Sequence, residues 1–166
     1  MSTIRRISIG LWFDSQAEEA ARFYTGIFRN SKITAITRYS EAGVEQHHRP
    51  AGSVMVVAFE LDGSAFTALN GGPLFKFSEA ISVQVSCANQ EEIDYYWEKL
   101  GAGGDPKSQQ CGWLKDRFGL SWQVVPQNMD EMFRSENAAG TKRAMEAMMK
   151  MKKIDIAELQ RARAGA

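Results

Sequence analysis

The chain contains one pattern of secondary structure twice, and this duplication limits the folds open to it. Alternation of apolar and polar side chains indicates strands, and each copy places a helix directly after its first strand. The first copy predicts strands at 4–13, 32–39, 54–61 and 65–70, with a helix from 16 to 28. The second copy predicts strands at 81–86, 109–115 and 120–125, with a helix at 90–100 and a poorly marked strand at 103–105. The pattern therefore predicts two βαβββ units, at about residues 4–70 and 80–126.

Local signals support these elements. Asp14 or Ser15 is expected to cap the first helix, and Asn89 is expected to cap the second. The pair at 62–63, Asp-Gly, is a strong hairpin signal between two strands. The helical period places the following residues in the buried stripe of the first helix: Ala17, Ala20, Ala21, Tyr24 and Phe28. The polar segment 40–52 is predicted to be a mobile loop.

The end of the chain differs from both copies, because its pattern is helical. A short helix is expected at 128–134, a Met-rich helix at 137–152, and a last helix that opens on a capping box from Asp155 to Glu158. Five residues could share an apolar face: Met145, Met148, Met149, Ile154 and Leu159. This face could pack on the chain's own sheet or contact another chain, since methionine stripes serve both purposes.

Charge and cysteine content exclude several classes of protein. The chain has 20 Lys and Arg against 20 Asp and Glu, so it lacks the excess positive charge of a strongly basic nucleic-acid binder. Two cysteines, Cys87 and Cys111, cannot form a disulfide framework, which favours a reducing, cytoplasmic setting. We identify no signal peptide, and no apolar run approaches the length of about 18 residues that a membrane span needs.

Several runs of the sequence are similar to those of one protein family. They are LWFDSQAEEAARFY at 11–24, FTALNGG at 66–72, QEEIDYYW at 90–97, QCGWLKDRFGLSWQVVP at 110–126 and MKMKKIDIA at 149–157. Together they resemble the PhnB-like branch of the vicinal oxygen chelate superfamily, a branch often labelled 3-demethylubiquinone-9 3-methyltransferase. The superfamily includes glyoxalase I, extradiol dioxygenases and bleomycin-resistance proteins.

The resemblance implies an α+β fold in which tandem βαβββ units form curved sheets of the glyoxalase and bleomycin-resistance type. We expect a domain of this type at 1–127 and a C-terminal helical extension at 128–166. Because superfamily members commonly build their cleft across a dimer, the resemblance also implies a homodimer.

The usual metal site of the superfamily is not expected here. Metal-using members place His or Glu on the first and last strands of each unit, where a divalent ion can hold two substrate oxygens. The positions that correspond in this chain are Ser8, Gly10, Trp12, Thr67, Ser82, Gln84, Ser86 and Gln123. Gln123 stands where a glutamate ligand would be expected, and an amide oxygen is a poor replacement for a carboxylate. We therefore predict no metal and no cofactor.

The same strand positions predict the surface that would bind a ligand. The predicted ligand-binding residues are Trp12, Thr67, Leu69, Gln84 and Gln123, with Ser82 on the same inner face. Amides, hydroxyls and an aromatic ring suit an uncharged or aromatic small molecule better than a phosphate. The main hypothesis is a metal-free small-molecule binding protein. The alternatives are an enzyme that acts on a small aromatic or quinone-like substrate, by metal-dependent or methyl-transfer chemistry, and a protein that binds a partner through its Met-rich tail.

The remaining candidates each have a simpler interpretation. His47 and His48 are interpreted as solvated loop residues, or else as part of a lid over a ligand. Cys111 is interpreted as a packed strand residue rather than a nucleophile, because no histidine is near it in the sequence. The charged run 115–117 is interpreted as a solvated turn. Glycine-rich turns at 70–73 and 101–104 lack the strand-to-helix context of a nucleotide site, so no site for S-adenosylmethionine can be identified.

Overall fold

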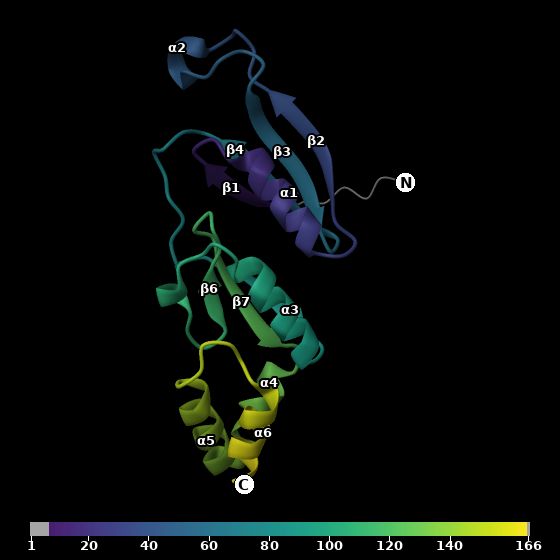
Figure 1. Ribbon diagram of the computed structural model, residues 1–166, viewed down its shortest axis with the longest axis vertical. Helices are drawn as coiled ribbons and strands as arrows, with labels where there is room; N and C mark the ends of the chain where they lie inside the picture. Colours follow the sequence, from purple (N-terminus) through teal and green to yellow (C-terminus); the bar gives the residue numbers. More distant parts are fainter. Residues whose placement is uncertain (1–6, 166) are drawn as a thin grey trace. The chain divides into compact units, whose positions relative to one another are not determined.

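A computed structural model describes residues 7–165. The predicted beginning of the first strand, residues 4–6, lies outside this range. The chain divides into two compact units between Lys76 and Phe77, and each is described by itself below. Both units combine a sheet with helices, which confirms the predicted α+β class (Figure 1).

The first unit has the predicted order of one strand, one helix and three strands. Its elements are β1 (Ile9–Phe13), α1 (Ala17–Ile27), β2 (Lys32–Arg38), the short helix α2 (Val44–His47), β3 (Val54–Leu61) and β4 (Ser64–Asn70). The sheet order is β1-β4-β3-β2, with β1 parallel to β4 and the other pairs antiparallel. Asp62 and Gly63 both have positive φ angles of 43° and 80° and turn β3 into β4, as the Asp-Gly signal predicted.

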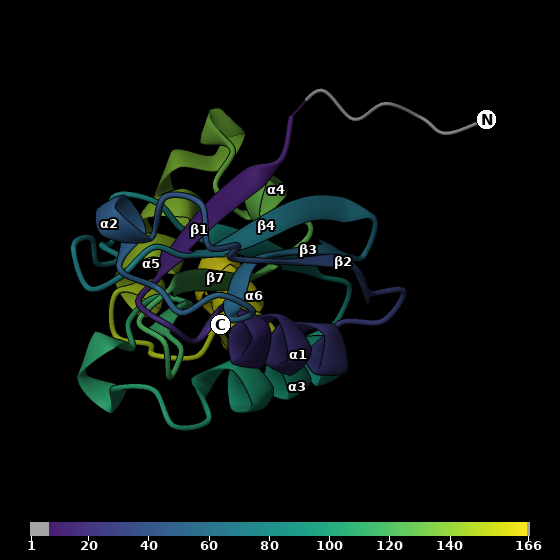
Figure 2. The same cartoon turned by 90° about the horizontal axis from the view of Figure 1, so that it is seen from above.

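Helix α1 covers one face of this sheet and closes the core of the unit (Figure 2). Tyr24 stacks on Phe59 with ring centroids 6.3 Å apart, and Phe59 stacks on Phe66 at 5.4 Å. All three rings are buried. The buried stripe of α1 ends at Ile27 rather than at Phe28, which is half-buried.

The start of α1 corrects the predicted cap. Gln16 is the N-cap residue, and neither Asp14 nor Ser15 takes that role. The amide oxygen of Asn70 instead accepts a hydrogen bond from the backbone N–H of Ala17 at 2.8 Å. A side chain at the end of β4 therefore satisfies one of the free N–H groups of the helix.

The second unit has three strands rather than four. Its elements before the tail are β5 (Val83–Cys87), α3 (Gln90–Gly101), the 3-10 turn η1 (Pro106–Ser108), β6 (Trp113–Lys115) and β7 (Ser121–Pro126), in the sheet order β5-β7-β6. The poorly marked strand at 103–105 does not form. Gly103 has a φ angle of +80°, and Asp105 accepts a hydrogen bond from the backbone N–H of Lys107, so the chain turns there instead of extending.

The helical tail belongs to this second unit. It consists of α4 (Met129–Met132), η2 (Ser135–Asn137), α5 (Ala138–Met148) and α6 (Ile156–Ala164), with α5 and α6 side by side (Figure 1). Asp155 accepts a hydrogen bond from the backbone N–H of Glu158, which confirms the predicted cap of the last helix. Ile154 and Leu159 are fully buried.

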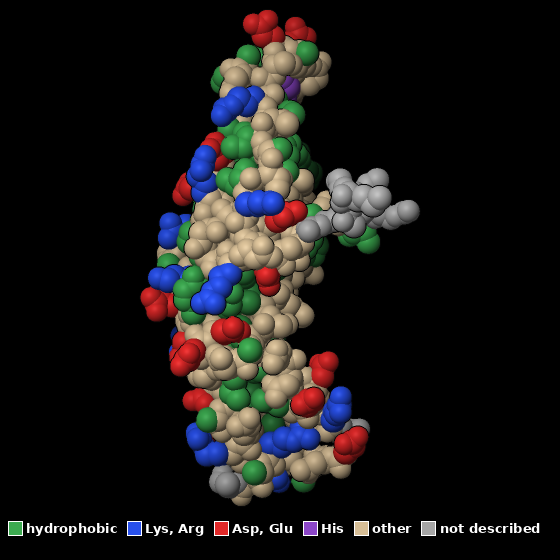
Figure 3. Space-filling model, turned by 90° about the vertical axis from the view of Figure 1, so that its right-hand side faces the viewer, with side chains coloured by type: hydrophobic (Ala, Val, Ile, Leu, Met, Phe, Trp, Pro, Cys, Tyr) green, Lys and Arg blue, Asp and Glu red, His purple; other side chains and the backbone are tan. Residues whose placement is uncertain are grey.

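Surface charge is mixed, as the composition predicted. On the face drawn in Figure 3, acidic and basic side chains are interspersed. Within residues 7–165, no helix is both long enough and apolar enough to cross a membrane.

Candidate functional site

The predicted ligand-binding residues fall into two groups, one on each sheet. Trp12, Thr67 and Leu69 lie in the first unit on the sheet face opposite α1, where Trp12 is paired with Leu69 across β1 and β4. Gln84 and Gln123 lie in the second unit and are paired across β5 and β7. The second group lines a pocket within its own unit, so it is described first.

The second unit has a pocket of about 380 Å³, open to solvent, between the open face of its sheet and the helical tail. The sheet side is lined by Gln84, Ser86, Trp113, Gln123 and Val125, and the tail side by Met129, Asp130, Phe133, Met145 and Met148. Backbone hydrogen bonds join the segment after α5 to the turn before β6, and Ile154 and Leu159 of the predicted apolar face are buried within the unit, whereas Met145 and Met149 remain exposed.

Gln123 lies at the centre of the sheet side. It faces Gln84 on one neighbouring strand and Trp113 on the other, so the three side chains form one row. The amide nitrogen of Gln123 donates a hydrogen bond to the hydroxyl of Ser82 at 2.8 Å. This row offers a ligand two amides and one indole ring.

Two parts of this pocket were not among the predicted site residues. Trp113 lies in the predicted strand at 109–115 but has no predicted role, although its alternation with Leu114 places it on the same face as Gln123. Met145 and Met148 were expected in an apolar face, and their spacing of three residues was a signal that both point the same way from a helix. The partner of that face could not be inferred from spacing.

The two cysteines differ in their surroundings. Cys111 is half-buried in a turn before β6, where its thiol lies 3.4 Å from the carbonyl oxygen of Met148 and 3.9 Å from the sulfur of Met149. Cys87 is fully buried, and burial raises the pKa of its thiol to about 12. A buried thiol with so high a pKa is a poor nucleophile.

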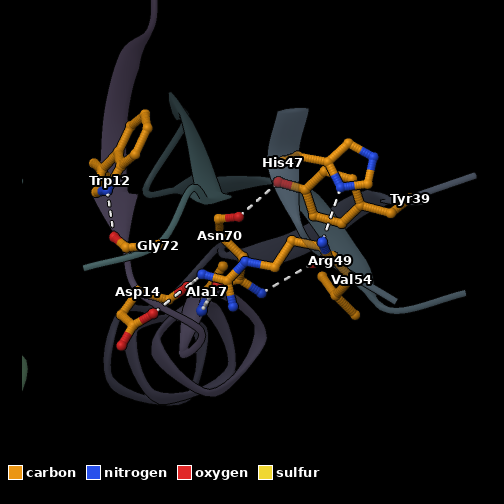
Figure 4. Close-up of polar contacts among 9 residues, drawn as sticks. All are labelled: Trp12, Asp14, Ala17, Tyr39, His47, Arg49, Val54, Asn70 and Gly72. Atoms are coloured by element: carbon orange, nitrogen blue, oxygen red, sulfur yellow. Dashed lines mark hydrogen bonds and ion pairs between the residues drawn. The ribbon is translucent and has the colours of Figure 1, made fainter. Parts of the chain in front are cut away.

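In the first unit, Trp12 is held in place on the open face of its sheet. Its indole N–H donates to the carbonyl of Gly72 at 2.8 Å (Figure 4). Its ring meets Phe75 edge-to-face with centroids 4.9 Å apart. A Cβ atom at Gly71 would overlap this ring, so the contact depends on glycine at that position. Thr67 and Leu69 are half-buried on the same face.

The segment 40–52 is folded against the same unit and includes α2. The ring of His47 packs on Tyr39 with centroids 4.4 Å apart, and its Nδ1 accepts a hydrogen bond from the backbone N–H of Arg49 (Figure 4). Arg49 in turn forms an ion pair with Asp14 at 3.1 Å. His48 is exposed, so the interpretation as a solvated residue fits His48 but not His47.

The charged run 115–117 also differs from its interpretation as a solvated turn. Asp116 is only 2% exposed, and its carboxylate accepts hydrogen bonds from the backbone N–H groups of Phe118 and Leu120 and from the indole of Trp122. Lys115 forms an ion pair with Glu79. Asp116 therefore organises the hairpin between β6 and β7.

The residues at the superfamily's metal positions do not fit a divalent ion. Hydroxyls, amides and an indole occupy these positions, where carboxylates or imidazoles are needed. In the described part of the chain, no three side chains of His, Cys, Asp or Glu gather in a group that could hold a metal ion.

Comparison with known proteins identifies relatives of the chain. The profile of the family described as 3-demethylubiquinone-9 3-methyltransferase matches residues 5–125. A PhnB protein from Bacillus cereus is 36% identical, and the match covers 73% of this chain and 99% of that one, with a TM-score of 0.61. No curated protein matches the chain.

Two more distant structures share the fold. Protein PA1353 from Pseudomonas aeruginosa is 19% identical with a TM-score of 0.55, and the match covers 74% of this chain and 98% of that one. The fosfomycin resistance protein FosX from Mesorhizobium loti is 15% identical with a TM-score of 0.52, and the match covers 78% of this chain and 97% of that one.

Proposed function

The chain belongs to the 3-demethylubiquinone-9 3-methyltransferase family, whose fold is that of the glyoxalase and bleomycin-resistance superfamily, and we propose that it is a small-molecule binding protein. Its ligand would be a small aromatic molecule held in the pocket of the second unit. Binding in this proposal needs no metal and leaves the ligand chemically unchanged.

One observation carries the proposal: two predicted ligand-binding residues, Gln84 and Gln123, line a pocket of about 380 Å³. This volume lies within the range of small-molecule sites. The indole of Trp113 and the methionines opposite supply apolar surface. The amides of Gln84 and Gln123 are polar groups on the sheet side, and the lining also includes Asp130.

The proposal is tested by a screen of small aromatic and quinone-like compounds with ligand-observed NMR, on protein treated with EDTA. We expect hits that lose affinity about tenfold in Gln123→Ala, because the variant removes a polar contact and a packing surface. Gln160→Ala, on the exposed side of α6, is the matched control and should bind as wild type. A complete absence of hits, or hits unaffected by Gln123→Ala, would contradict the proposal.

A second candidate is an enzyme, and the description of the matched family favours methyl transfer in particular. Such an enzyme would bind S-adenosylmethionine, which isothermal titration calorimetry detects directly. Binding of this cofactor with a dissociation constant in the micromolar range, and methylation of a quinol, would favour the enzyme. Tight binding of Zn²⁺, Ni²⁺, Mn²⁺ or Fe²⁺ would instead favour the metal-dependent chemistry of the superfamily.

We also propose that the protein is a cytoplasmic homodimer. The free thiols of Cys87 and Cys111 suit a reducing compartment. Members of the superfamily that the chain resembles commonly build their cleft across a dimer, and Ile81, which is 72% exposed, is a large apolar side chain that such an interface would cover. Light scattering after size-exclusion chromatography should give twice the mass of 18.5 kDa. A monomeric mass would contradict this part of the proposal, and a dimer unaffected by Ile81→Asp would show that Ile81 lies outside its interface.

A further inference from the structure

One wall of the pocket is built from residues beyond the region that the family profile matches. The matched region ends at Val125, whereas the tail side of the pocket is built from α4, α5 and the segment between them. The B. cereus protein is matched over 99% of its own length but covers only 73% of this chain. The tail residues that line the pocket, Met129 to Met148, therefore lie after the profile match and before the family-like run at 149–157.

Hydrogen bonds hold this wall in place at two points. The backbone N–H groups of Cys111 and Gly112 donate to the carbonyls of Met151 and Lys152 at 2.9 and 2.8 Å. On the other side, the side chain of Gln90 at the start of α3 bonds to the backbone on both sides of Asp155, through the carbonyl of Ile154 and the N–H of Ile156. The segment between α5 and α6 is thus tied to both β6 and α3.

The side chains of the wall indicate an aromatic ligand. Met129, Met145 and Met148 are flexible and polarizable, and thioethers pack favourably against aromatic rings. Phe133 lies on the same wall, and Trp113 lies on the sheet side. A flat ring placed in the pocket would have thioethers and Phe133 on the tail side and the indole of Trp113 on the sheet side.

The charge of the pocket lining indicates the sign of the ligand's charge. Asp130 is the one residue with a formal charge among those that line the pocket, and no described residue forms an ion pair with it. Trp113 and Phe133 add the negative faces of their rings, which attract cations. A carboxylate with aromatic neighbours is the arrangement that recognises an organic cation.

We propose that the C-terminal extension, residues 128–165, makes the pocket selective for planar aromatic monocations. The inference rests on the proposed binding function and deepens it by naming the class of ligand. The extension supplies both the carboxylate of Asp130 and the thioether surface, so selectivity for charge and for aromatic shape would come from the same added segment.

Three probes of nearly the same size and shape test the proposal: N-methylquinolinium is a cation, 1-methylnaphthalene is neutral and 1-naphthoate is an anion. Ligand-observed NMR titrations give the three dissociation constants. We expect N-methylquinolinium to bind about fivefold more tightly than 1-methylnaphthalene, the gain that one exposed carboxylate gives at contact distance. We expect 1-naphthoate to bind most weakly.

Matched variants assign the effect to the extension. Asp130→Asn should remove the preference for the cation and leave the affinity for 1-methylnaphthalene unchanged, while Glu131→Gln, the neighbouring exposed carboxylate outside the pocket, should change neither. Met148→Ala should raise the dissociation constants of the cation and of the neutral probe alike, about fivefold to tenfold, because it removes packing surface. Met149→Ala, next to it but outside the pocket lining, is the control. Circular dichroism and a thermal melt check that each variant folds.

Each outcome bears on one of the two proposals. If the cation and the neutral probe bind equally and Asp130→Asn changes nothing, charge selectivity is overturned while the pocket remains a binding site. If Met148→Ala and Met149→Ala have the same affinities as wild type, the role of the extension is overturned. If no probe binds and the aromatic screen also gives no hits, the proposed binding function itself fails.

Discussion

Gln123 donates a hydrogen bond to the hydroxyl of Ser82 at 2.8 Å, between residues 41 positions apart in the chain. The bond uses one of the two N–H donors of the Gln123 amide. Among the described residues no donor is recorded for the amide oxygen, so that oxygen can accept a hydrogen bond from a ligand in the pocket. Ser82 is therefore a positioning residue for the central amide of the sheet.

Ser82→Ala should weaken the binding of an aromatic ligand about threefold to fivefold, because a typical hydrogen bond contributes about 1 kcal/mol and its loss lets the Gln123 amide rotate. The dissociation constant of the best compound from the screen measures this effect. Ser86→Ala is the control, since Ser86 lines the same pocket but is exposed. Equal losses in the two variants would show that Ser82 has no special role.

Gly71→Ala should destabilise the first unit by about 1–3 kcal/mol, because the added methyl group would overlap the ring of Trp12. The ring would have to move, and its hydrogen bond to Gly72 would break. Urea unfolding followed by tryptophan fluorescence measures the change. Gly26→Ala is the control: nothing lies within 4 Å of the added methyl group, and alanine is the better helix former, so this variant should be as stable as wild type or more so.

Asp116→Asn should destabilise the second unit by about 1–3 kcal/mol. One carboxylate oxygen accepts from Phe118 and Leu120 and the other from Trp122, so replacing either oxygen with an NH₂ group leaves a donor without an acceptor. Asp62→Asn, on the exposed turn of the other hairpin, should cost less than about 0.5 kcal/mol. If Asp116→Asn and Asp62→Asn lower the denaturant midpoint by the same amount, this account of Asp116 is contradicted.

Iodoacetamide at pH 8 should label Cys111 in the folded protein and leave Cys87 unlabelled. Burial raises the pKa of Cys87 to about 12, so the thiol stays protonated and inaccessible, whereas Cys111 is half-exposed. In urea both should react. Mass spectrometry of tryptic peptides gives the two rates, and labelling of Cys87 at the rate of Cys111 in the folded protein would contradict the prediction.

The raised pKa of the Cys87 thiol predicts that the stability of the protein depends on pH. Its pKa is about 12 in the folded state and 9.0 for an unperturbed thiol, so the folded state keeps the proton when the unfolded state loses it. The contribution of this thiol to the free energy of unfolding is complete below pH 9 and is lost as the pH rises toward 12. Cys87→Ala should therefore lose less stability between pH 8 and pH 11 than wild type. Parallel losses in the two proteins, measured by urea unfolding, would contradict this assignment.

Much of the fold could be predicted because its signals are local. The alternation of the strands, the Asp-Gly turn at 62–63 and the caps at Asn89 and Asp155 each involve residues a few positions apart, and the structure confirms them. The duplicated pattern also predicted the order of the strands and helices along the chain. The fourth strand of the second unit had no such signal, and it does not form.

The features that could not be predicted depend on distant contacts. Asn70 caps α1 across 53 residues, in place of the nearer Asp14 or Ser15. Asp116 is buried because Trp122 and two backbone N–H groups surround it, which a charged run in a turn does not indicate. The pocket needed the docking of the tail on the sheet, whereas the sequence indicated only that Gln84 and Gln123 share a face.

The central claim is that the pocket of the second unit binds an aromatic ligand without a metal. Its most direct test is a two-dimensional ¹H–¹⁵N NMR titration of EDTA-treated protein with N-methylquinolinium. The account predicts that the indole N–H of Trp113 and the side-chain amides of Gln84 and Gln123 shift during the titration, while the indole N–H of Trp97 stays in place. Shifts confined to other residues, or shifts of these groups only after a divalent metal is added, would contradict it.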